Sequence, residues 1–149
     1  MFKTINGKNI DLVTHIKEYL KAHTDVHIYV GSDSQNKANT TTYVTTVVLY
    51  SPGKGGHLVY NKTKLDRENN KRTRLIKETM LSIETANIMI ENMLPAPEFI
   101  DLDINGNKRF KSYNYLEEAM NMVYAYGFKC RNKTNGQVAA HCADWFVRN

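Results

Sequence analysis

Four acidic residues of this chain have the chemical type and the sequence surroundings to bind divalent metal ions. Asp33 follows an apolar run, and Glu78 stands early in the longest helical pattern. Asp103 ends a second apolar run, and Asp144 lies in the last helical pattern. Hard cations such as Mg²⁺ take oxygen ligands and usually keep several waters. Two such ions a few ångströms apart can hold the attacking and leaving oxygens of a phosphodiester cleavage.

Two of these acids have a plainer interpretation, which the residues alone leave open. Asp33 lies in a Gly-Ser-Asp-Ser segment, where a turn aspartate would hydrogen-bond its own backbone. Glu78 could be a solvated glutamate paired with Arg74 or Lys77. Glu84 competes with Glu78, but a separation of six residues is about 9 Å of helix rise, so one metal pair cannot take both.

Asp101 and Asp103 project from the same side of one predicted strand, because side chains alternate with period two. Two acids in a buried strand are costly unless something compensates their charge, and metal coordination would do so. Asp103 is nearer the end of the strand and is the first choice as ligand. Asp101 is expected either to support that ligand or to be a second one.

His141 precedes Asp144 by three residues, so the two share one face of the predicted last helix. His141 could pass a proton to a leaving group or help to place a metal. The alternative is a surface histidine beside a turn.

The elements that must position these residues follow from hydrophobic periodicity and turn residues. The first half of the chain predicts one helix, over 11–23, capped by Asn9 or Asp11. It also predicts three strands, over 26–32, 40–50 and 57–64. The first strand ends at the Gly-Ser-Asp-Ser turn and is followed by a polar loop over 35–39, and a turn over 51–56 joins the second strand to the third. The second half alternates helix and strand: a helix over 71–94 ended by Pro95, a strand over 99–104, a helix over 115–126 closed by Gly127, a strand over 128–131 and a helix over 138–147. This order predicts an α/β domain with a five-stranded mixed sheet.

The composition indicates a soluble, cytoplasmic protein made of one domain over 1–149. Hydrophobic residues make up 42% and charged residues 23% of the sequence, which is ordinary for a globular chain. No stretch approaches the length of a membrane span, and the first residues lack an apolar signal core. Cys130 and Cys142 show no metal-ligand spacing, and a reducing compartment is expected.

The net charge of +5 favours a polyanionic partner, and nucleic acid is the expected one. Two basic runs could hold phosphates, although the alternative for each residue is a solvated cationic face. The candidates are Lys62, Lys64, Lys71, Arg72 and Arg74 before and in the long helix, and Lys108, Arg109 and Lys111 after Asp103.

Seven short motifs, from about residue 26 to the C-terminus, resemble the ribonuclease H-like superfamily. More narrowly, the chain is similar to the ribonuclease H-like family of small bacterial proteins typified by YkuK. The motifs are Val30-Gly-Ser-Asp-Ser-Gln35, Gly53-Lys-Gly-Gly56, Arg74-Leu-Ile-Lys-Glu78 with Ser82 and Ala86, Asp103-Ile-Asn105, Ser112, Tyr126-Gly-Phe128, and Ala139-Ala140 with Ala143-Asp144. The helix over 11–23 lies outside the core pattern of the superfamily.

The resemblance implies a ribonuclease H-like fold and a metal site built from Asp33, Glu78, Asp103 and Asp144. It implies two Mg²⁺ or Mn²⁺ ions and a nuclease that cleaves either RNA in hybrids or structured DNA. One variant is a resolvase of four-way DNA junctions, which would work as a homodimer rather than as a monomer. The alternative of another class is a nucleic-acid-binding module that has kept the fold without catalysis.

Overall fold

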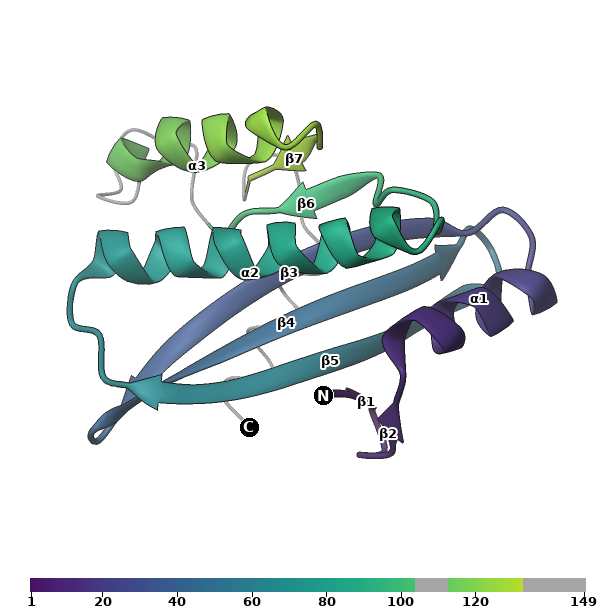
Figure 1. Cartoon of the computed structure of the whole chain (residues 1–149), viewed down its shortest axis with the longest axis horizontal. Coiled ribbons are helices and arrows are strands. Elements are labelled where there is room, and N and C mark those ends of the chain that lie inside the picture. The colour runs from purple at the N-terminus through teal and green to yellow at the C-terminus, as the bar shows by residue number, and fades with distance from the viewer. Residues whose placement is uncertain (104–112, 133–149) are drawn as a thin grey trace.

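The computed structural model describes residues 1–103 and 113–132 of the chain, and Figure 1 shows the arrangement of its elements. A seven-stranded mixed sheet with the order β2-β1-β5-β4-β3-β6-β7 forms the base of the structure. The strands are β1 (Phe2–Thr4), β2 (Asn9–Ile10), β3 (His27–Lys37), β4 (Thr40–Ser51), β5 (Gly55–Asp66), β6 (Phe99–Asp101) and β7 (Cys130–Arg131). The helices of the described residues are α1 (Leu12–Ala22), α2 (Lys71–Glu91) and α3 (Tyr113–Ala125).

The α/β class and the order of elements from α1 to β7 were predicted correctly, but the five-stranded sheet was wrong. The two additional strands, β1 and β2, pair with each other and join the sheet through β5. They are three and two residues long, which is too short for hydrophobic periodicity to reveal them. The helix predicted over 138–147 lies outside the described residues.

Strand β3 also runs further than predicted, and this changes the setting of Asp33. The expected Gly-Ser-Asp-Ser turn and the polar loop over 35–39 are mostly strand, because β3 pairs with β4 without a break as far as Lys37↔Thr40. The side chains of Gln35 and Lys37 are polar because this end of the strand is exposed, whereas the backbone pairing continues. Asp33 is therefore a strand residue and not a turn aspartate.

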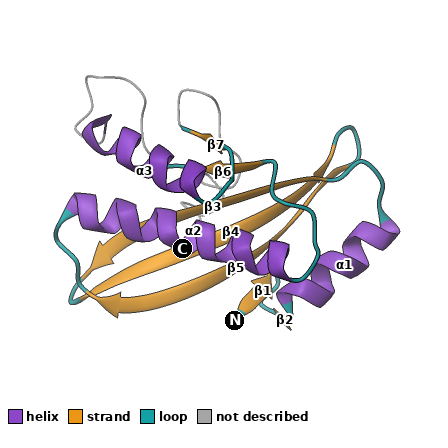
Figure 2. Ribbon diagram, turned by 45° about the horizontal axis from the view of Figure 1, so that its top comes forward, coloured by secondary structure: helices purple, strands orange, loops and turns teal. Residues whose placement is uncertain are grey.

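Helices α1 and α2 begin at residues that cap them and pack against one face of the sheet (Figure 2). The Asp11 carboxylate accepts the backbone N–H of Thr14 at 3.0 Å, and the Asn70 side-chain oxygen accepts that of Thr73 at 3.0 Å. One apolar cluster joins α1, the end of α2 and strands β3, β4 and β5. A second cluster joins α2, β6 and α3. The first cluster packs α2 against the central strands of the sheet, and the second packs α2 against β6 and α3.

Within the described residues, no helix is both long and apolar enough to span a membrane.

Candidate metal centre

The first determinant of the site is the register of the two parallel strands β3 and β6. Gly31 of β3 pairs with Asp101 of β6, and β6 ends there. Asp33 and Asp103 each follow this pair by two residues. Because β3 and β6 run parallel, residues that follow this pair by the same number of positions lie at the same level along the two strands, and the two aspartates come out side by side. Asp103 itself lies beyond the strand, so the alternation rule that placed it on the same side as Asp101 does not apply to it.

The second determinant is the buried face of α2. Buried side chains recur on this helix at Leu75, Glu78, Ser82, Ala86 and Met89, a spacing of three or four residues that marks one face. Glu78 therefore points toward the sheet and is only 5% exposed, which contradicts the interpretation as a solvated glutamate. Glu84 falls off this face and is exposed.

Ser34 connects the carboxylates that come from β3 and α2. Its Oγ donates a 2.8 Å hydrogen bond to Glu78 Oε2, and its backbone N–H donates one of 2.8 Å to Asp33 Oδ1. Hydrogen bonds to carboxylates are among the stronger ones in proteins because the acceptor is charged. One residue thus fixes the position of two acidic side chains relative to each other.

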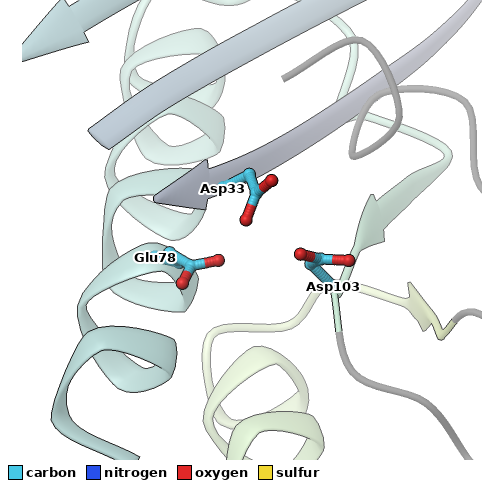
Figure 3. A group of neighbouring side chains, drawn as sticks. All are labelled: Asp33, Glu78 and Asp103. Atoms are coloured by element: carbon cyan, nitrogen blue, oxygen red, sulfur yellow. The ribbon is translucent and has the colours of Figure 1, made fainter. Parts of the chain in front are cut away.

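Asp33, Glu78 and Asp103 bring one carboxylate oxygen each to within 4.8 Å of one another. Figure 3 shows them pointing into a common space from a strand, a helix and the segment after β6. Asp33 and Glu78 are buried, and Asp103 is half-buried. Negative charges at this separation repel strongly where little water screens them. A set of oxygen donors in this arrangement fits a divalent cation such as Mg²⁺ or Mn²⁺.

A small, mostly polar cleft between β3, α2 and the end of β6 includes two of these acids, Glu78 and Asp103. Its lining comprises Ser32, Leu75, Glu78, Thr79, Ser82, Asp101, Leu102 and Asp103. The Ser32 hydroxyl shares hydrogen bonds with those of Ser82 at 2.7 Å and Thr45 at 2.9 Å. These neutral contacts hold α2 against β3 directly beside the acidic group.

The charge of Glu78 influences a neighbouring tyrosine on β4. Burial raises the pKa of Tyr43 above its ordinary value, the negative charges of Glu78 and Glu68 raise it further, and the positive charge of Arg74 lowers it. Arg74 precedes Glu78 by four residues and so lies one turn along the same helix. Its Nε is buried and makes no hydrogen bond among the described residues. The Arg74 guanidinium therefore lies close enough for its charge to oppose the effect of Glu78 on the pKa of Tyr43.

Asp101 lies outside the group of three and has its charge compensated in another way. Arg131 donates two hydrogen bonds to its carboxylate, at 2.9 Å from Nε and at 3.1 Å from Nη2. A metal ion is thus not required to explain the burial of Asp101. Its assignment as a metal ligand has no support from this arrangement.

The basic candidates of the described residues differ in their surroundings. Lys62, Lys64 and Lys71 are exposed, and Arg74 is half-buried. Arg72 forms an ion pair with Glu118 of α3, including a 2.9 Å hydrogen bond from Nε, so it joins two helices. The predicted residues Lys108, Arg109, Lys111, His141 and Asp144 lie outside the described residues.

Two residues with clear contacts at the site were not predicted as functional. Ser34 belongs to the quoted Gly-Ser-Asp-Ser motif, and its place next to Asp33 was the available signal. Arg131 had no comparable signal, because its partner Asp101 is 30 residues away in the sequence.

The sequence model of the family described as ribonuclease H-like matches residues 11–148, which is most of the chain. The chain belongs to the ribonuclease H-like family. One solved structure similar to this ribonuclease H-like protein is RNase H1 from the halophilic archaeon Halobacterium salinarum. It shares 16% identity over 81% of this chain and 98% of its own, with a TM-score of 0.37. No curated protein sequence matches the chain significantly.

Proposed function

We propose that this ribonuclease H-like protein is a metal-dependent nuclease that hydrolyses phosphodiester bonds in nucleic acid. The observation that carries the proposal is the convergence of Asp33, Glu78 and Asp103 from three separate elements. Membership of the family described as ribonuclease H-like supports it. We also propose the narrower YkuK-type assignment and a cytoplasmic location.

The proposed cofactor is a pair of Mg²⁺ or Mn²⁺ ions held by these three carboxylates, with Asp144 as a fourth ligand. When bound, such ions supply Lewis acidity that activates water and offsets negative charge on the leaving oxygen. His141 is proposed to assist proton transfer. The residues of the chain contribute the placement: Ser34 orients Asp33 and Glu78, and the pairing of β3 with β6 brings Asp103 to them.

The proposed substrate is either the RNA strand of a hybrid or a structured DNA. The exposed Lys62, Lys64 and Lys71 are proposed to bind phosphates of the substrate, and Lys108, Arg109 and Lys111 are proposed to add to this positive charge. A resolvase of four-way junctions would need two sites that face a symmetric substrate. Sedimentation of the protein with and without a junction would distinguish this homodimer from a monomer.

The deciding experiment is cleavage of labelled single-stranded DNA, single-stranded RNA, duplex, hybrid and four-way-junction substrates in Mg²⁺ and in Mn²⁺. Wild-type protein is compared with Asp33→Asn and with Asp66→Asn, which changes an exposed aspartate at the end of β5. We expect the wild type and Asp66→Asn to cleave and Asp33→Asn not to cleave. Full cleavage by Asp33→Asn would refute the site assignment. No cleavage by any protein, together with binding that survives EDTA, would support the non-catalytic binding module.

Asp33→Asn is also expected to fold, because the asparagine oxygen can still accept the Ser34 N–H. In EDTA the variant loses one of three mutually repelling charges, and we expect its melting temperature to equal or exceed that of the wild type. A large drop in melting temperature would mean that the carboxylate has a structural role, and the loss of cleavage would then not identify a ligand.

A further inference from the structure

We propose that Arg131 is a positioning residue for Asp103, an inference that rests on the metal site of the proposed function. Arg131 does not belong to the group of three carboxylates. It holds the end of the strand from which Asp103 emerges, and this contact is what makes Asp103 available to a metal ion. Figure 1 shows β7, which carries Arg131, beside β6.

The first observation is the quality of the contact between Arg131 and Asp101. The Asp101 side chain is fully buried, that of Arg131 is 19% exposed, and two hydrogen bonds join them in parallel. A guanidinium matches a carboxylate at two points, which fixes orientation as well as distance. Lysine offers a single ammonium and cannot reproduce this geometry.

The second observation is that the backbone of β6 is held at the same point. Asp101 and Arg131 are register partners in the parallel pair of β6 and β7. The backbone N–H of Leu102 donates to the Arg131 carbonyl at 2.8 Å. The Asp101 side chain and the Leu102 backbone N–H therefore both bind Arg131, while β3 holds the opposite edge of β6 through Gly31↔Asp101.

The third observation is that the guanidinium is itself fixed by two aromatic rings. Its central carbon lies 4.5 Å from the ring centre of Tyr29 and 4.8 Å from that of Phe99. Cations are attracted to the faces of aromatic rings, most strongly where water is excluded. Tyr29 belongs to β3, the strand of Asp33, and Phe99 belongs to β6, the strand that leads to Asp103. Arg131 thus contacts both the strand that carries Asp33 and the strand that leads to Asp103.

A buried ion pair of this kind is weak evidence for stability, because a well-packed apolar replacement is often as good. Outer residues that orient metal ligands, in contrast, typically change metal affinity about 10- to 100-fold when they are replaced. The arrangement around Arg131 corresponds to that of such an orienting residue, since its hydrogen bonds with Asp101 and Leu102 end within two residues of Asp103.

The test measures Mn²⁺ affinity by electron paramagnetic resonance for the wild type, Arg131→Lys and Arg131→Gln, with folding checked by circular dichroism. Arg67→Gln is the matched control, because Arg67 also makes two side-chain hydrogen bonds, to Asn69 and to the carbonyl of Ala38, away from the cleft. Binding of a labelled nucleic acid in EDTA is measured alongside. If Arg131→Gln fails to fold, Arg131→Lys, which keeps the charge opposite Asp101, carries the test.

We expect Mn²⁺ affinity to fall about 10- to 100-fold in Arg131→Gln, less in Arg131→Lys and not at all in Arg67→Gln. Nucleic-acid binding in EDTA should not change. Unchanged Mn²⁺ affinity in both Arg131 variants would overturn the inference and leave the proposed function standing. Higher affinity would also overturn it, because it would mean that Asp101, once released, ligates the metal. A wild type that binds no Mn²⁺ would overturn the inference together with the proposed function.

Discussion

Gly31 of β3 is paired in parallel register with Asp101 of β6, and the candidate ligands Asp33 and Asp103 each follow this pair by two residues. β6 ends at Asp101, so its register with β3 ends at Gly31. Glu78 approaches Asp33 and Asp103 from α2, and Ser34 fixes it there. The position of the acidic group therefore depends on the register between β3 and β6 and on the buried face of α2.

Metal ions are expected to stabilise the folded protein through this group. A ligand that binds only the folded state, at about 100 times its dissociation constant, adds about 2.7 kcal/mol to the free energy of unfolding. Glu78→Gln should abolish the increase in melting temperature that Mg²⁺ or Mn²⁺ causes in the wild type. Glu84→Gln, an exposed change on the same helix, should retain it. An equal response of both variants in a thermal melt would argue against Glu78 as a ligand.

Ser34→Ala should weaken metal binding without removing any candidate ligand. The substitution deletes the 2.8 Å hydrogen bond to Glu78 and leaves that carboxylate less well oriented. We expect a loss of about 10-fold or more in Mn²⁺ affinity by calorimetry. Ser82→Ala is the matched control, because it deletes a neutral hydrogen bond to Ser32 in the same cleft. Comparable losses in both variants would indicate a general packing effect.

The contribution of His57 to the stability of the protein should fall on acidification. Its Nε2 lies 2.7 Å from that of His15, so protonating both rings would break this contact. Burial lowers the pKa of His57 below the ordinary histidine value, and the charges of His15 and His23 lower it further. Below about pH 6.5 the unfolded state therefore binds more protons than the folded state, and the free energy of unfolding decreases as the pH falls.

Urea unfolding between about pH 7.5 and about pH 5.5 checks this prediction in the wild type and in His57→Gln. The variant should lose stability less steeply on acidification. His27 provides the opposite sign, because its contact with Glu98 raises its pKa. The stabilisation that His27 contributes is fully present below its pKa in the unfolded state and is lost as the pH rises through its pKa in the folded state. His27→Gln should therefore reduce the loss of stability that occurs as the pH rises. Slopes that change in the same direction in both variants would contradict the assignment.

The exposed lysines and Arg72 should differ in their effect on nucleic-acid binding. Lys64 is exposed on β5, whereas Arg72 is paired with Glu118. In EDTA, Lys64→Gln should reduce the slope of log affinity against log salt by about 0.9 for duplex DNA, the value for one phosphate contact. Arg72→Gln should leave the slope unchanged. An equal reduction in both variants would mean that Arg72 contacts phosphate despite its ion pair.

Local patterns in the sequence were sufficient for the central strands and for α1 and α2. Runs of alternating or three-to-four spacing place Ile28, Val30 and Ile83 in the core, and these residues are buried. Such patterns depend only on neighbouring residues and on the period of a helix or strand. The short strands β1 and β2 and the full length of β3 escaped because backbone pairing, not side-chain polarity, defines them.

The candidate site likewise has features that local sequence determines and features that depend on the tertiary structure. The sequence by itself determined which acids follow apolar runs and which glutamate precedes the middle of the long helix, because these are properties of local order and residue type. Only the tertiary structure decided that Asp33, Glu78 and Asp103 meet, that Ser34 joins two of them, and that Asp101 pairs with Arg131. These outcomes depend on strand register and helix packing between distant segments, and a one-residue change in register would turn each side chain to the other face.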